Sequence, residues 1–121
     1  MISSRIYLIR AVYNWLFDCN MSVFIAVNAE YEGVEVPSQH VQDGRIVLDI
    51  SPEAVQDLDL AHEIITFNAS FSGKRMQLMV PVMAVEAIYS AENGRGMVFG
   101  PEDPLSGELH PDPSPEAGAE V

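Results

Sequence analysis

Cysteine and basic residues are scarce in this chain, and long hydrophobic runs are absent. Cys19 is the single cysteine, which excludes an intrachain disulfide and a cysteine-based zinc cluster, fits a reducing compartment and predicts a cytoplasmic protein. Six lysines and arginines stand against 18 acids, so the formal net charge of -12 argues against nucleic acid and anionic membrane as partners. Arg10, Asn14 and Asp18 interrupt the N-terminal apolar segment, so we expect neither a signal peptide nor a membrane span.

The residue patterns of catalytic and metal sites are also missing. His40, His62 and His110 have no HxH or HExxH spacing, and no serine stands in a glycine-framed nucleophile elbow. Cys19 has no cationic neighbour in sequence to activate it and is interpreted as buried filler. We therefore predict no enzymatic activity and no metal site.

Two further segments resemble ligand-binding loops without having the required spacing: the acids between residues 53 and 63, and the glycine pair at 94 and 96. These acids are Glu53, Asp57, Asp59 and Glu63. Their spacing is not that of a calcium loop, so a solvated charge run is favoured. Gly94-Arg95-Gly96 lacks the following helix with Lys and Ser or Thr that a phosphate loop needs, and is interpreted as a turn.

Residues 3–19 have the periodicity of a helix that Ser3 or Ser4 can cap. The predicted core stripe consists of Leu8, Val12, Trp15, Leu16 and Cys19. A second apolar set lies partly off that stripe and consists of Ile6, Ile9, Tyr13 and Phe17. Two interpretations stay open. Either the helix is sunk in the core, or the second set packs against another copy of the chain and forms a homodimer.

The rest of the folded part is predicted to be mainly β. Strand-like runs occupy 23–31, 34–36, 46–50, 64–71, 76–80 and 97–99, with a solvated loop at 53–63 anchored by Leu58 and Leu60 and a short helix at 82–89. Because strands follow one another without crossover helices, a doubly wound α/β fold is disfavoured. We expect a small, strongly bent antiparallel sheet or partly open barrel, covered at one end by the N-terminal helix.

The composition changes after residue 99. Residues 100–121 contain five of the eight prolines, several acids and not one Lys or Arg. Such a segment has too few large apolar residues to offset its ordering entropy. We therefore predict one domain over residues 1–99 and a disordered acidic tail over residues 100–121.

The stretch from 43 to 73 offers the clearest functional signal. Its two runs, 46–50 and 64–71, are framed by the turn formers Asp43-Gly44 and Ser72-Gly73. In the second run Ile65, Phe67, Ala69 and Phe71 alternate with Ile64, Thr66, Asn68 and Ser70, so one face is core and the other is usable surface. A bent sheet with an open edge can take up an extended peptide. The alternative is that both runs are plain core strands.

Several segments together resemble the stringent starvation protein B (SspB) family. They are IYLIRAVYNWLFDCN, GVEVPSQHVQDGRIVLDISPEAV, ITFNASFSGK and VPVMAVEAIYSAENGRGMVF followed by PED. The resemblance covers roughly residues 7–102 and keeps the family's order of segments. It implies a homodimer whose N-terminal helices pack together, each subunit being a small barrel similar to the Sm fold. It also implies an adaptor that binds the ssrA tag of proteins rescued by tmRNA and tethers them to the ClpX unfoldase of the ClpXP protease, without a cofactor.

The resemblance also implies which residues form the peptide groove. They are Val47, Leu48, Asp49 and Ile50 on one side and Phe67, Asn68, Ala69, Ser70 and Phe71 on the other. In this interpretation Ala69 leaves room for the peptide, Phe67 or Phe71 walls a pocket, and Asn68 bonds to the peptide main chain.

The chain departs from the family pattern at two places. Ser70 stands where a cation is frequent, so Arg45, Lys74, Arg75 or Arg95 would have to supply the charge for an acidic tag. The chain also ends in PSPEAGAEV, without the basic and apolar segment that docks on ClpX. A rival hypothesis is an Sm-like structural or ribosome-associated module without delivery activity, although six dispersed cations provide no basic face for RNA.

Overall fold

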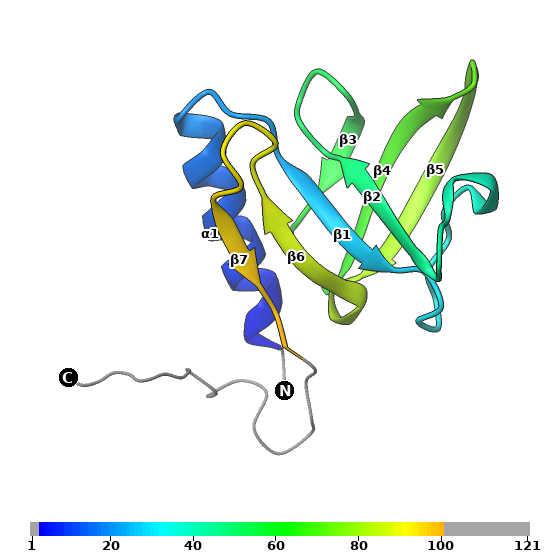
Figure 1. Ribbon diagram of the computed structural model, residues 1–121, viewed down its shortest axis with the longest axis horizontal. Helices are drawn as coiled ribbons and strands as arrows, with labels where there is room; N and C mark the ends of the chain where they lie inside the picture. Colours follow the sequence, from blue (N-terminus) through cyan, green and yellow to red (C-terminus); the bar gives the residue numbers. More distant parts are fainter. Residues whose placement is uncertain (1–2, 101–121) are drawn as a thin grey trace.

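The computed structural model describes residues 3–100; residues 1–2 and the predicted tail from residue 101 onward lie outside the described part. One α-helix and two antiparallel sheets make up the fold (Figure 1). The elements are α1 (Ser4–Asp18), β1 (Phe24–Asn28), β2 (Arg45–Asp49), β3 (Gln56–Asp59), β4 (Ile64–Phe71), β5 (Lys74–Pro81), β6 (Val85–Tyr89) and β7 (Gly96–Val98), with 3-10 turns at Ser38–His40 and Val82–Ala84. The predicted class, mainly β with an N-terminal helix, is confirmed.

The two sheets differ in size and in their connections. The larger has the strand order β2-β1-β6-β7, and the smaller has the order β3-β4-β5. Helix α1 packs against β6, β7 and the turn at Val82–Ala84, while the three-stranded sheet lies behind β1 and β2 in the view of Figure 1. The sheets do not close into a complete barrel, so β2 remains an edge strand beside the smaller sheet.

Local sequence signals explain both ends of α1. Ser3 is its N-cap, and the Ser3 Oγ atom accepts a 3.1 Å hydrogen bond from the Arg5 N–H. At the other end Asn20 has a φ of 59°, and Met21 N–H donates to the Leu16 carbonyl. This left-handed residue and its back-bonded neighbour form a Schellman-type stop.

Two predicted tight turns are confirmed. Ser72 and Gly73, with φ of 53° and 82°, connect β4 and β5 in register, so that Phe71 lies opposite Lys74. Asp43 and Gly44 also both have positive φ, at 55° and 76°, and close the bridge that leads into β2. Positive φ at both central residues matches the right-handed twist of the flanking strands.

The prediction of a short helix at 82–89 is wrong beyond Ala84. Residues 85–89 form β6, which pairs with β1 and β7. A bulge shifts the β1–β6 register, so that Val85 and Ile88 both face the core although they are three residues apart. That spacing imitates a helical period and explains the error.

The segment 53–63 was predicted to be a loop, but Gln56–Asp59 forms the edge strand β3. Its pairing with β4 is irregular, and Asp57 has a φ of 58°. A short, polar and bulged edge strand has no alternation for a pattern search to find. Leu58 and Leu60 do pack against the core, as expected of anchors.

A single hydrophobic core lies between the helix and the two sheets. It is built from inward-facing residues of α1 (Ile6, Ile9, Val12, Leu16), of the larger sheet (Ile25, Val27, Ile46, Leu48, Val85, Ile88) and of the smaller one (Ile65, Phe67, Leu78, Val80). The strand alternation in β4 is therefore as predicted, with Ile65 and Phe67 buried and Ile64 exposed.

Candidate functional site

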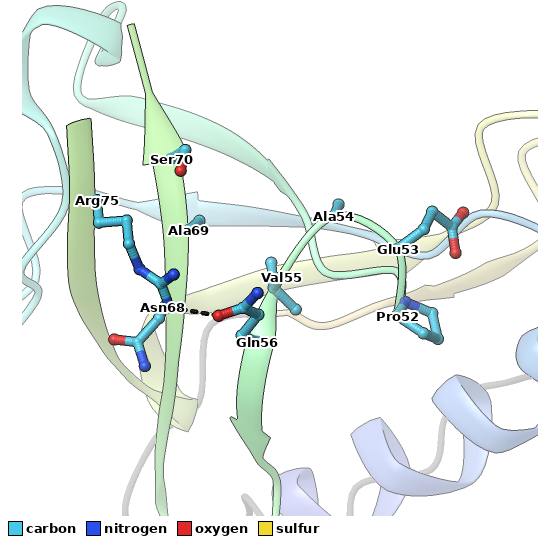
Figure 2. Close-up of a pocket in the computed structure, with 9 residues that line it drawn as sticks. All are labelled: Pro52, Glu53, Ala54, Val55, Gln56, Asn68, Ala69, Ser70 and Arg75. Carbon is cyan, nitrogen blue, oxygen red and sulfur yellow. Dashed lines mark hydrogen bonds between the residues drawn. The ribbon is translucent and has the colours of Figure 1, made fainter. Parts of the chain in front are cut away.

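A groove made of two adjoining cavities lies along β4, one beside β2 and the other beside residues 52–55 and the start of β3. One part is a cavity of about 270 Å³ lined by Phe24, Val47, Leu48, Asp49, Ala54, Phe67, Ala69, Ser70 and Phe71. The other part is a cavity of about 310 Å³ lined by Pro52, Glu53, Ala54, Val55, Gln56, Asn68, Ala69, Ser70 and Arg75 (Figure 2). Both parts share Ala54, Ala69 and Ser70. We call the whole the inter-sheet groove.

Strand position explains the apolar half of the groove. In β2 the side chains alternate, so Leu48 is buried while Val47 is 52% exposed at the sheet edge. Phe67 of β4 is buried beneath the seam, and the partly buried Ala69 follows it on the same face. A small residue above a large buried ring leaves open space. The groove thus has an apolar floor and the unpaired main-chain edge of β2 as one rim.

The loop that forms the other rim is held by Ser51. The side chain of Ser51 is buried, and its Oγ atom accepts a 2.8 Å hydrogen bond from the N–H of Val23. Its own N–H donates to Asp49 Oδ1 at 2.9 Å, and its carbonyl accepts from Ala54 N–H at 2.9 Å. These bonds place Ala54 in the middle of the groove. The Asp49 carboxylate, at the groove wall, therefore helps to hold this loop by accepting the hydrogen bond from Ser51.

The second half of the groove is polar. Asn68 Nδ2 donates to Asp57 Oδ2 at 3.0 Å, which connects β4 to the edge strand β3. A guanidinium N–H of Arg75, on β5, donates to Gln56 Oε1, on β3, and so reaches across β4. At the apolar end, the rings of His40 and Phe71 lie 5.3 Å apart. An extended peptide would meet apolar contacts at one end of the groove and hydrogen-bonding groups at the other.

Eight of the nine predicted groove residues line the two cavities; Ile50 does not, because its side chain is fully buried in the core. Seven further lining residues were not among the predicted groove residues, although Arg75 was one of the four cations considered as a source of charge for an acidic tag; they are Phe24, Pro52, Glu53, Ala54, Val55, Gln56 and Arg75. Arg75 was within reach of the sequence, because a two-residue turn at Ser72-Gly73 places it directly opposite Ser70. Phe24 and Ala54 come from other elements and gave no local signal.

A larger cavity, of about 560 Å³, lies at the opposite end of β1 and β2, and its cations are already engaged. Arg5 donates to the carbonyls of Met83, Val85 and Gly100 and packs over the ring of Phe99. Arg45 forms a 2.7 Å ion pair with Glu86, which raises the pKa of the Arg45 guanidinium. The inter-sheet groove is therefore the better candidate for ligand binding.

The histidines and the other candidate catalytic residues are dispersed. His62 lies 3.4 Å from Asp59 on an exposed loop, and the pKa of Asp59 is lowered mainly by a hydrogen bond from the Ala61 N–H. Within residues 3–100 no three His, Cys, Asp or Glu side chains are grouped as a metal site would require. Cys19 is exposed, so its interpretation as buried filler is wrong. His110 lies outside the described residues.

Helix α1 distributes its apolar side chains differently from the prediction. Ile6 and Ile9 are buried in the core of the subunit, whereas Leu8 and Trp15, which were assigned to the core, are exposed. Trp15 is 45% exposed and Phe17 50% exposed, and the Phe17 ring stacks on Tyr13 at 6.4 Å. The outer face of α1 therefore presents large apolar groups to solvent.

Among the described residues, none of the helices has the length and hydrophobicity needed to span a lipid bilayer.

Comparison with known proteins assigns the chain to a family. The family model described as stringent starvation protein B matches residues 3–120. The chain belongs to the stringent starvation protein B family. It is similar to the stringent starvation protein B homolog of Haemophilus influenzae, with 44% identity over 112 residues that cover 93% of this chain and 74% of the relative. Stringent starvation protein B is a family of protein-binding adaptors and not a known family of enzymes.

Proposed function

We propose that this chain is a proteolytic adaptor that binds the ssrA degradation tag in the inter-sheet groove and tethers tagged proteins to ClpXP in the cytoplasm. Family membership and the groove itself support the proposal. The observation that carries it is the open seam between β2 and β4, where Val47 is exposed above the buried Phe67 and the small Ala69 leaves space.

The groove suits an extended peptide for two physical reasons. The free edge of β2 offers main-chain donors and acceptors, and a peptide strand can pair with them. The cavities on either side of Ala69 accept alternate side chains, which an extended strand projects every second residue. Binding of this kind uses no chemistry on the ligand. It holds a tagged protein near the unfoldase and so raises the effective concentration of substrate.

We also propose that the chain works as a homodimer that pairs through α1. The large exposed side chains of the helix supply the apolar surface: Tyr7, Leu8 and Trp15 lie on one flank with the exposed Ala11, and Phe17 lies on the other. Exposed aromatic residues of this kind are typical of interface centres. Two subunits would provide two grooves, so that one unfoldase particle can be offered two tags.

The test is the binding of a fluorescent ssrA peptide, measured by anisotropy against a scrambled peptide. Ala69→Gln should fill the groove and abolish binding while leaving the circular dichroism spectrum intact, because Ala69 lines both cavities. Ala91→Gln is the matched control, since Ala91 is exposed in a turn and lines neither cavity. Equal binding of ssrA and scrambled peptides, or full affinity in Ala69→Gln, would contradict the proposal.

Delivery needs a separate measurement. Degradation of an ssrA-tagged fluorescent protein by ClpXP should speed up at low substrate concentration when the chain is added, because tethering lowers the apparent Michaelis constant. A chain that binds the peptide without stimulating degradation would instead support the rival function, an Sm-like binding module without delivery activity. Comparing residues 1–121 with residues 1–100 in a ClpX pull-down tests whether residues 101–121 take part.

A further inference from the structure

Arg75 places a guanidinium in the polar half of the inter-sheet groove. It lies directly opposite Ser70 in the β4–β5 ladder. In Figure 2 its side chain extends from β5 across β4 and donates a hydrogen bond to Gln56 on β3. Asn68, Ser70 and Arg75 line the same cavity, so a ligand group in this cavity would lie near the guanidinium.

The charge of Arg75 is not paired within residues 3–100. The ion pairs among these residues join Arg45 to Glu86 and His62 to Asp59, and neither involves Arg75. Gln56, its hydrogen-bond partner, is a neutral amide. Among the lysines and arginines of residues 3–100, Arg75 is the one that lines the inter-sheet groove.

Two acids lie near this part of the groove: one accepts a hydrogen bond from Asn68, and the other lies far from Arg75. The Asp57 carboxylate accepts the hydrogen bond of Asn68. Glu53 lines the same cavity but stands at its opposite end from Arg75 in Figure 2. The lining of the polar half therefore has a cationic end at Arg75 and an anionic end at Glu53, and an acidic ligand group is favoured beside Arg75 rather than beside Glu53.

We propose that Arg75 is a specificity-determining residue that pairs with a carboxylate of the bound peptide, so that the groove selects extended peptides carrying an acidic residue beside Ser70. The inference rests on the proposed function and names the chemistry of its ligand. Arginine has five N–H donors in a planar fork, and the bond to Gln56 uses one of the outer nitrogens while it orients the rest. Such pre-orientation reduces the entropy lost on binding.

The experiment compares two peptides and three proteins. The peptides are the fluorescent ssrA peptide and an analogue in which every Asp and Glu is replaced by Asn and Gln. The proteins are the natural chain, Arg75→Gln and Lys74→Gln. Lys74 is the neighbouring cation on β5 and does not line the groove, so both substitutions change the net charge equally and only one removes the local contact.

The natural chain and Lys74→Gln should bind the acidic peptide about three- to tenfold more tightly than the amide analogue, a range typical of a charge-assisted bond at a partly exposed site. Arg75→Gln should bind the two peptides equally. In the Arg75→Gln background, Ser70→Arg should restore at least part of the preference, because positions 70 and 75 face each other across the ladder. Thermal unfolding of each variant checks that the fold is kept.

The outcomes separate this inference from the proposed function. A natural chain that binds the amide analogue as tightly as the acidic peptide overturns the role of Arg75 and leaves tag binding intact. An unchanged acidic preference in Arg75→Gln overturns it as well. Equal losses for both peptides in Arg75→Gln would assign Arg75 to holding β3 through Gln56, and also overturn it. Failure of the natural chain to bind either peptide overturns the proposed function first and this inference with it.

Discussion

The main-chain N–H of Val23 donates to the Oγ atom of Ser51 at 2.8 Å, and both residues are buried. This bond joins the start of β1 to the loop that follows β2. The same loop carries Pro52, Glu53 and Ala54, which line the inter-sheet groove. One buried hydroxyl therefore fixes the groove rim to the larger sheet, so the stability of the fold and the shape of the groove are coupled at this point.

Replacing Ser51 with alanine should destabilise the fold and loosen the groove. The Val23 N–H would stay buried without its acceptor, which lowers the free energy of unfolding by about 1–3 kcal/mol. Urea denaturation measures the loss, and Ser38→Ala, an exposed serine in the Ser38–His40 turn, is the control. Affinity for the ssrA peptide should fall in the first variant only. A Ser51→Ala protein as stable as Ser38→Ala would show that the bond has no net value.

Two glycines near the last strand predict different effects of the same substitution. A Cβ atom on Gly96 would lie 2.0 Å from the Ile88 carbonyl oxygen, whereas a Cβ on Gly94 would meet nothing within 4 Å. Gly94 has a φ of 73°, near the left-handed helical region, where an alanine costs about 1 kcal/mol of backbone strain, whereas the φ of 156° at Gly96 lies outside that region. Gly96→Ala should lose clearly more than Gly94→Ala, because it must displace β7 from β6. Equal denaturation midpoints for the two variants would contradict the predicted clash.

Alternation and turn chemistry were sufficient to predict much of the smaller sheet. The limits of β4 and the turn at Ser72-Gly73 agree with the prediction, because both depend on residues next to each other in the chain. The strand β6 was not predicted, because its stability comes from pairing with β1 and β7 and its bulge hides the strand period. Propensity gives way to tertiary pairing there.

The groove residues also fall into some that could be predicted from the sequence and some that could not. Residues 47–49 and 67–71 were assigned from the two strand runs and the family resemblance, and the structure brings them together. Ile50 lines neither cavity because it follows β2 directly, where its N–H donates to the Val23 carbonyl and its side chain turns into the core. Phe24 and Gln56 are distant in sequence, and only the arrangement of the two sheets places them at the seam.

Glu92 should make stability depend on pH on the acid side. Its pKa is lowered from 4.5, first by the Ser22 N–H and then by the hydroxyls of Ser90 and Ser22. A carboxyl whose pKa is depressed in the folded state contributes stability above its unfolded pKa, and this contribution is lost as the pH falls through the lower folded value. The natural chain should therefore exceed Glu92→Gln in thermal midpoint at pH 7, and the gap should narrow as the pH falls below 4.5 and through the lower pKa of the folded state.

The control for this pH profile is Glu32→Gln, which removes the same charge at an exposed turn residue after β1. Its thermal midpoint should follow that of the natural chain more closely at pH 7. A gap between the natural chain and Glu92→Gln that persists unchanged at acidic pH would mean that the glutamate acts through packing and not through its charged form.

The exposed face of α1 makes the proposed dimer testable by mass. Light scattering at micromolar concentration should give twice the 13.3 kDa of one chain. Trp15→Glu introduces a charge among Tyr7 and Leu8, whereas Phe17→Glu or Tyr13→Glu introduces one at the stacked pair on the other flank. Because a buried unpaired charge disfavours an interface by several kcal/mol, the substitution that lies in the interface should give a monomer. Gln39→Glu, exposed in the Ser38–His40 turn, controls for charge alone. A monomeric natural chain, or dimers in all three helix variants, would rule out pairing through α1.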